Sequence, residues 1–185
     1  LAEGGIPCAE ITFRTDAAVE SLRRIAAERP EVLAGAGTVL TPVQAAQARE
    51  AGARFIVSPG FNPAVVDDCL AHDVPVFPGV CTPTEIEMAL GKGLRVLKFF
   101  PAEPIGGLPY LKAIAAPYAG VEFIPTGGIT AQHLGAYLAF EPVIACGGSW
   151  MASAAWIRAG EFARIRAHTE NAVSVAKGRP PVRAV

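Results

Sequence analysis

Short apolar runs alternate with longer stretches of helical periodicity along the whole chain. The apolar runs predict strands over residues 8–13, 32–36, 55–58, 74–77, 96–99, 122–125 and 143–145. The stretches between them predict helices over residues 17–28, 42–51, 63–72, 83–90, 108–116, 131–139 and 162–176. Three of these helices carry a capping side chain before a proline at the first helical position: Thr41-Pro42, Asn62-Pro63 and Thr82-Pro83. Regular strand–helix alternation indicates parallel pairing through right-handed crossovers.

Seven strand–helix units favour an α/β fold, a (β/α)8 barrel of the TIM type rather than an open doubly wound sheet. Seven strands do not close an eight-stranded barrel, and the chain has only 185 residues. Its opening, Leu1-Ala2-Glu3-Gly4-Gly5, resembles the last turn of a helix with its glycine stop. We therefore expect the first strand and most of the first helix to be missing. We also expect one barrel domain over residues 1–176 and a disordered tail over residues 177–185.

Composition narrows the class of protein. The formal net charge is −1, which argues against a nucleic-acid partner. The apolar stretches are strand-sized and no secretory signal opens the chain, so we expect no membrane partner. The widely spaced Cys8, Cys69, Cys81 and Cys146 form no CxxC pair and predict free thiols in a reducing cytoplasm. None of the histidines stands near them in a ligand spacing, so no metal site is predicted.

One lysine stands out because it interrupts an apolar strand, Val96-Leu97-Lys98-Phe99-Phe100-Pro101. Burial disfavours the ammonium form and so predicts a lowered pKa for Lys98. A neutral amine can attack a ketone and form a Schiff base. The alternative is an ion-paired lysine, or one that reaches water at the strand end. Lys92 and Lys112 are further candidates, but their positions at a helix end and in mid-helix predict solvated side chains.

Polar residues and glycines follow most of the predicted strands, at the end where barrel enzymes carry their active sites. Glu10 and Arg14 point to one face of their strand, where the carboxylate suits proton transfer and the guanidinium suits a substrate carboxylate. The alternative for these two is a mutual ion pair at the rim. Gly127-Gly128 and Gly148-Ser149 follow the last two strands, a common place for a phosphate site.

The motifs together resemble the KDPG/KHG aldolases, which are class I (Schiff-base) 2-keto-3-deoxy-6-phosphogluconate and 4-hydroxy-2-oxoglutarate aldolases. The similarity extends from about Gly5 to Ala152, and its most specific parts are Glu-Ile-Thr-x-Arg-Thr at residues 10–15 and Lys-Phe-Phe-Pro-Ala-Glu at residues 98–103. The other matching segments are Gly35-Ala36-Gly37-Thr38, Ser58-Pro59-Gly60, Pro125-Thr126-Gly127-Gly128 and Gly148-Ser149-Trp150.

The resemblance implies a cytoplasmic, homotrimeric (β/α)8 barrel of the Entner–Doudoroff pathway that needs no metal or other cofactor beyond a covalent imine at Lys98. Its substrate would be a small 2-keto acid, and its products pyruvate with glyceraldehyde 3-phosphate, or with glyoxylate from the shorter substrate. Glu10 would be the general acid/base. The resemblance assigns substrate contacts to Arg14 and Thr38 at the C1 carboxylate, Thr126 at the C4 hydroxyl, Gly127, Gly128 and Ser149 at the phosphate, and Phe100 and Pro59 around the pyruvyl group.

Two other functions fit the same barrel. A metal-dependent aldolase or phosphosugar isomerase should carry a cluster of Glu, Asp or His at the strand ends, where only Glu10 qualifies. A non-catalytic phosphosugar-binding barrel, such as a truncated paralogue, should keep the phosphate loops and lack Lys98 and Glu10. Both residues are present.

Overall fold

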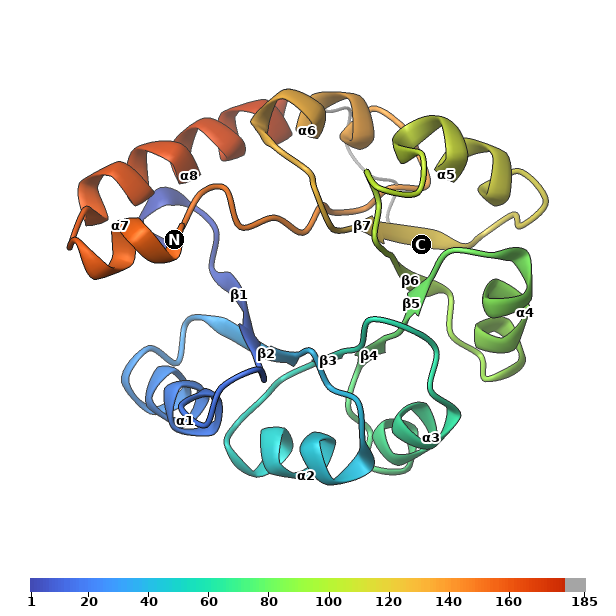
Figure 1. The fold of residues 1–185 in the computed structure, drawn as a ribbon, viewed down its shortest axis with the longest axis horizontal. Helices are drawn as coiled ribbons and strands as arrows, with labels where there is room; N and C mark the ends of the chain where they lie inside the picture. The colour runs from blue at the N-terminus through green and yellow to red at the C-terminus, as the bar shows by residue number, and fades with distance from the viewer. Residues whose placement is uncertain (179–185) are drawn as a thin grey trace.

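The computed structural model describes residues 1–178, in which parallel strands surround a common centre and helices cover the outside (Figure 1). The prediction of an α/β barrel is confirmed for this part of the chain. Of the tail predicted to be disordered, Lys177 is the last residue of a helix, and residues 179–185 lie outside the described residues.

The strands pair in the order of the sequence, and every pairing is parallel. One row contains β1 (Cys8–Thr12), β2 (Leu33–Gly37), β3 (Ile56–Val57) and β4 (Val76–Phe77), and a second contains β5 (Gly79–Val80), β6 (Val96–Phe99) and β7 (Glu122–Pro125). Pro78 separates β4 from β5 within one extended segment, and its carbonyl accepts a hydrogen bond from the Lys98 N–H at 3.0 Å. The two rows are therefore continuous, and β6 and β7 have the predicted bounds.

Each predicted helix is present, with ends no more than one residue from the prediction. The helices are α1 (Ala18–Glu28), α2 (Pro42–Glu50), α3 (Pro63–Ala71), α4 (Pro83–Gly91), α5 (Gly107–Ala115), α6 (Ala131–Leu138) and α8 (Phe162–Lys177). The predicted caps are confirmed, since the side chains of Thr41, Asn62 and Thr82 each accept a backbone N–H of the following turn. Cap and proline together set where these helices begin after their strands.

Two short elements complete the described chain. The opening residues form a 3-10 turn, η1 (Ala2–Gly4), and Gly5 ends it with φ of 96°, as the helix-stop interpretation predicted. Helix α7 (Ala154–Arg158) was not predicted; it packs beside α8, and Ser153 caps its first turn.

The strand predicted over residues 143–145 is wrong in its extent. The segment meets β7 and the residue that follows it at two isolated parallel bridges, Phe123 with Val143 and Thr126 with Gly147. Three steps along β7 correspond to four along this segment, so one extra residue bulges out and breaks the regular ladder. The segment still runs beside β7, on the side opposite β6, and within residues 1–178 the other strand flanking the open side of the ring is β1 (Figure 1).

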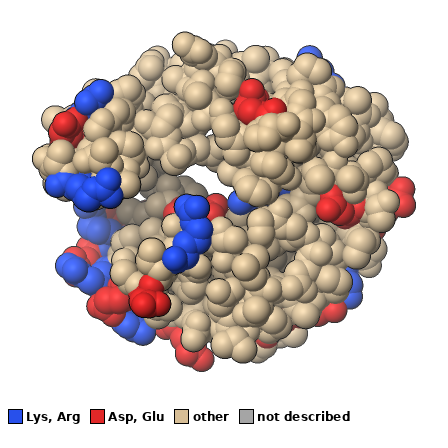
Figure 2. Space-filling model, in the orientation of Figure 1, with Lys and Arg blue, Asp and Glu red and all other residues tan. Residues whose placement is uncertain are grey.

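Two hydrophobic clusters support the ring. The cluster under β5, β6 and β7 contains large side chains, among them Phe99, Phe123 and Tyr137. The cluster under β1, β2 and β3 is built mainly from alanine and valine. On the face shown in Figure 2, uncharged residues cover most of the surface, and basic and acidic atoms come together beside the central opening.

Candidate active site

Lys98 is buried in the middle of the ring. It lies on β6 between Leu97 and Phe99, and only 6% of its surface is exposed. Its Nζ is 4.8 Å from the centre of the Phe100 ring. Burial lowers the pKa of Lys98, while the negative charge of Glu10 acts in the opposite direction. The predicted buried amine with a lowered pKa is therefore present.

Glu10 lies on β1, across the ring from β6, at an exposed position of the strand. Its carboxylate lies against Gly37 of β2, and a Cβ at Gly37 would overlap the Oε1 atom. The negative charge of Glu10 raises the pKa of Lys98, so the two groups lie within electrostatic range of each other. The structure thus brings together the two groups that the sequence assigned to chemistry.

The predicted alternative of a Glu10–Arg14 ion pair is not found. Among residues 1–178, the guanidinium of Arg14 has no ion-pair partner. Arg14 is exposed and lines a hollow of about 410 Å³ together with residues from α1 and α2. Thr38 is half-buried and follows Gly37 on the next strand. The cation and the hydroxyl are therefore available to a ligand at this side of the ring.

The turn Ser58-Pro59-Gly60 lies against β5, the strand that pairs with the lysine strand β6. The Ser58 hydroxyl donates to the Gly60 carbonyl at 2.8 Å, which closes the turn. The Pro59 carbonyl packs against Gly79, where a Cβ would overlap it, and Gly79 pairs with Lys98. Pro59 is thereby held one strand away from the amine.

Phe100 lies between the amine and the first glycine loop. Gly127 has φ of 101°, and a Cβ there would lie 3.3 Å from the Phe100 ring. The next residue, Gly128, has φ of 80°. Both values fall in the left-handed region that glycine adopts most easily, so the sequence of two glycines permits this tight turn.

The last two loops leave the ring side by side. Thr126 bridges to Gly147, so Gly127-Gly128 and Gly148-Ser149 follow directly from paired positions. The Thr126 hydroxyl donates to the Ile124 carbonyl at 3.3 Å. Ser149 is exposed beyond this bridge. The residues assigned to a phosphate site therefore share one end of the ring.

Sequence reasoning missed the steric role of two glycines. Gly37 leaves room for the Glu10 carboxylate, and Gly147 leaves room for the Thr126 hydroxyl, because a Cβ at either position would overlap the oxygen. A sequence signal for this role was available, because both glycines belong to motifs at the ends of strands. It also missed Tyr137, whose O–H donates to Glu103 at 2.6 Å from 34 positions away, and no local signal could have found it.

Residues 1–178 contain neither a cluster of metal ligands nor a helix that could span a membrane. No group of three or more His, Cys, Asp or Glu side chains in residues 1–178 is placed to hold a metal ion. None of the helices described is long and apolar enough to cross a bilayer. The four cysteines are free thiols.

Comparison with known proteins decides the family. The family model for KDPG and KHG aldolases matches residues 1–168. The chain belongs to the KDPG and KHG aldolase family. It is therefore an aldolase, a carbon–carbon lyase, as the motifs at Glu10 and Lys98 predicted.

Individual members of the KDPG and KHG aldolase family are similar over most of their length. A 2-dehydro-3-deoxy-phosphogluconate aldolase of Treponema pallidum is 52% identical over 95% of this chain and 83% of its own. The KHG/KDPG aldolase of Escherichia coli K12 is 43% identical over 96% and 83%. A solved KDPG aldolase of Legionella pneumophila, with pyruvate captured as a covalent carbinolamine, has a TM-score of 0.88, 38% identity and coverage of 94% and 83%.

Proposed function

We propose that this aldolase forms its Schiff base at Lys98 and cleaves 2-keto-3-deoxy-6-phosphogluconate to pyruvate and glyceraldehyde 3-phosphate. The shorter 4-hydroxy-2-oxoglutarate is the second substrate and yields pyruvate and glyoxylate. The observation that carries the proposal is a buried lysine of lowered pKa facing the charge of Glu10. The covalent carbinolamine captured in the Legionella pneumophila relative supports the same chemistry.

The reaction follows from a neutral amine beside a carboxylate. The Lys98 amine attacks the C2 ketone, and the carbinolamine loses water to become an iminium ion. Glu10 takes the C4 hydroxyl proton through a water molecule, the aldehyde leaves, and the electrons of the C3–C4 bond pass into the iminium. Glu10 then returns a proton to C3 of the enamine, and hydrolysis releases pyruvate. No external cofactor enters these steps.

The substrate lies across the ring in this proposal. Its C1 carboxylate binds Arg14, whose planar guanidinium can donate two parallel hydrogen bonds, and Thr38 adds another. Phe100 and Pro59 pack against the pyruvyl part, and Thr126 contacts the C4 hydroxyl. At the far end the phosphate accepts hydrogen bonds from the backbone of Gly127 and Gly128 and from the hydroxyl of Ser149.

The active form is a cytoplasmic homotrimer serving the Entner–Doudoroff pathway. Large apolar side chains remain exposed on the single chain, including Val43 at 67% and Phe162 at 65%, and a partner subunit would cover such surfaces. Free thiols suit a reducing compartment. Light scattering should give three times the chain mass of 19.2 kDa, and a monomeric active enzyme would contradict the trimer.

Borohydride reduction in the presence of pyruvate, followed by peptide mass mapping, tests the central claim. The reduced pyruvyl adduct should appear on Lys98. Lys112 is a matched control, because its Nζ also lies over a ring, 5.6 Å from Phe140, but its side chain is exposed. Lys92 is a second control, paired with Asp67 at 2.7 Å. An adduct on either control and none on Lys98 would refute the assignment.

A further inference from the structure

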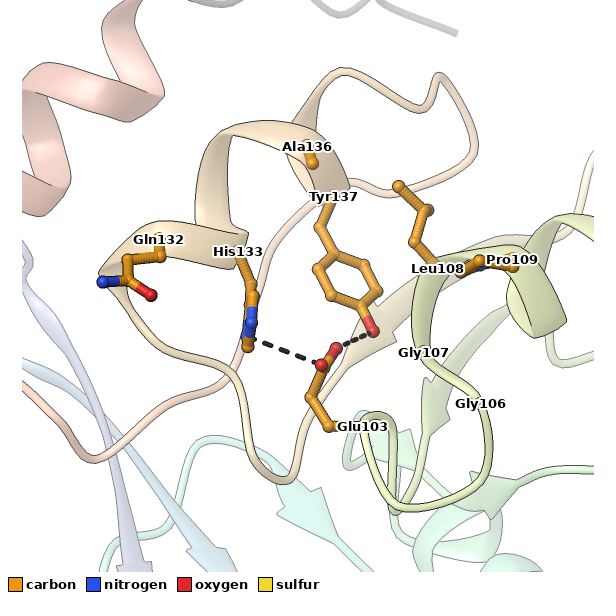
Figure 3. A pocket seen from close by; sticks show the side chains of 9 residues that line it. All are labelled: Glu103, Gly106, Gly107, Leu108, Pro109, Gln132, His133, Ala136 and Tyr137. Atoms are coloured by element: carbon orange, nitrogen blue, oxygen red, sulfur yellow. Dashed lines mark hydrogen bonds and ion pairs between the residues drawn. The ribbon is translucent and has the colours of Figure 1, made fainter.

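Behind the Gly127–Gly128 turn lies a cluster of polar side chains to which the reaction assigns no role (Figure 3). Glu103 stands on the loop between β6 and α5, and its carboxylate points toward α6. The Tyr137 hydroxyl donates to Oε1 of Glu103 at 2.6 Å, and Nδ1 of His133 lies 3.6 Å from Oε2. These side chains line a hollow of about 470 Å³.

Backbone hydrogen bonds from the segment that follows β6 fix the Gly127–Gly128 turn. The N–H of Ala102 donates to the Thr126 carbonyl at 2.8 Å, and the N–H of Glu103 donates to the Gly127 carbonyl at 3.0 Å. A trans peptide unit is planar and directs its N–H opposite to its C=O. The N–H groups of Gly127 and Gly128 therefore face away from β6, toward the segment that carries Gly147 and Ser149.

The Glu103 side chain supports the same turn by contact. A Cβ at Gly128 would lie only 2.7 Å from the Cβ of Glu103, so the two backbones approach closely. Its carboxylate is fixed by Tyr137, which is 1% exposed and belongs to the helix that begins just after the turn. Burial and the bond to Glu103 both raise the pKa of Tyr137, so its hydroxyl stays protonated and donates. Glu103 thus links the turn to α6.

We propose that Glu103, anchored by Tyr137, is a positioning residue that orients the Gly127 and Gly128 N–H groups toward the substrate phosphate. The proposal rests on the function proposed above, since it concerns the phosphate end of that site. Neither side chain touches the reacting atoms. Loosening the turn should therefore weaken binding of a phosphate and leave imine formation at Lys98 intact.

Kinetics on two substrates test the proposal. Tyr137→Phe and Glu103→Ala should raise KM for the phosphorylated six-carbon substrate by roughly two- to tenfold, the equivalent of one typical hydrogen bond. The change should stay below about twofold for 4-hydroxy-2-oxoglutarate, which has no phosphate, and kcat should hold on both. Glu103→Gln keeps an acceptor for the Tyr137 hydroxyl and should retain a KM close to that of the parent.

The chain offers a matched control. The hydroxyl of Tyr118 donates to Glu87 at 3.0 Å in an exposed pair outside the site. Tyr118→Phe removes the same kind of hydrogen bond and should leave both KM values unchanged. A rise in KM for the phosphorylated substrate in this variant, equal to that of Tyr137→Phe, would overturn the proposal.

Other outcomes separate this proposal from the proposed function. Equal losses on both substrates, or an unchanged KM for the phosphorylated one, would overturn the role of Glu103. If Glu103→Ala fails to fold, the KM values of Tyr137→Phe and Glu103→Gln test the positioning role instead. Should Ser149→Ala discriminate between the substrates while Tyr137→Phe does not, only the positioning role fails. Absence of pyruvate trapping at Lys98 in the parent enzyme would instead refute the proposed function.

Discussion

The two charged groups central to the proposed chemistry come from halves of the ring that differ in character. Lys98 belongs to the half of β6 and β7, where large side chains such as Phe99 and Phe123 are fully buried. Glu10 belongs to the half of β1 and β2, where the core consists mainly of small residues and β1 alternates between exposed and half-buried positions. Lys98 is 6% exposed, whereas Glu10 and Arg14 are exposed among residues 1–178.

The burial of Lys98 matches the charge state that a nucleophile needs. A lysine nucleophile must lose its proton, and burial in a bulky core lowers its pKa. We call the half of the ring with the buried Lys98 the dry side, and the half with the exposed Glu10 and Arg14 the wet side.

The largest expected effect is on the dry side. Lys98→Ala removes the nucleophile and should reduce cleavage of both substrates to the uncatalysed level, because no imine can form. Pyruvate and borohydride should leave the variant unlabelled, as judged by intact mass. Lys112→Ala is its control and should retain full labelling. Residual cleavage through another labelled lysine would show that burial does not select the nucleophile.

On the wet side, the next largest effect is expected on turnover when Glu10, the proposed proton carrier, is substituted. Glu10→Gln keeps the size of the side chain and should slow turnover by roughly 10²–10⁴-fold, the usual range for a lost general acid/base. Trapping of pyruvate on Lys98 should remain measurable, which separates proton transfer from imine formation. Normal turnover would mean that a water chain or Thr126 carries the proton.

Arg14 tests whether the wet side binds the carboxylate. Arg14→Ala should raise KM by roughly tenfold to a hundredfold, because a hydrogen bond to a charged group contributes about 1.5–3 kcal/mol. Both substrates carry the C1 carboxylate, so their KM values should rise equally, with kcat less affected. A loss confined to the phosphorylated substrate would place Arg14 at the wrong end of the ligand.

Ser149 gives a smaller effect with the opposite selectivity. Ser149→Ala removes one donor, at a cost of about 0.5–1.5 kcal/mol and more with a dianionic phosphate. Steady-state kinetics should show this loss with the phosphorylated substrate and almost none with 4-hydroxy-2-oxoglutarate. Equal losses would indicate that Ser149 supports the fold instead.

The smallest expected effect is a change in the pKa of Lys98 when Glu10, from the other half of the ring, is substituted. The negative charge of Glu10 favours the ammonium form of Lys98 and so raises its pKa, against the larger lowering by burial. Glu10→Gln should therefore move the pKa of Lys98 further below the ordinary lysine value of 10.5. The pH dependence of Lys98 acylation, followed by mass spectrometry, measures this shift. A midpoint that moves upward would contradict the assigned geometry.

Local sequence signals predicted most of the helices and strands. The prediction that failed concerns a segment whose structure depends on its pairing with another strand. The helix starts followed from caps such as Thr41 and Asn62 with their prolines, because capping depends only on neighbouring residues. The segment from Val143 is apolar enough for a strand, but its ladder with β7 is broken by an extra residue. The hydrophobic pattern indicates which face of a strand is buried. An extra residue opposite a partner strand shows only in the pairing of the two segments.

The sequence by itself determined the barrel class, the family motifs and the candidate nucleophile, since these depend on periodicity and on residues close together in the chain. Only the tertiary structure decided that Gly37 makes room for Glu10 and that Tyr137 anchors Glu103 from 34 positions away. The burial of Lys98 and its interaction with Glu10 were also decided only by the tertiary structure. Burial and electrostatic interaction depend on the distances between side chains from several strands, and folding alone sets those distances.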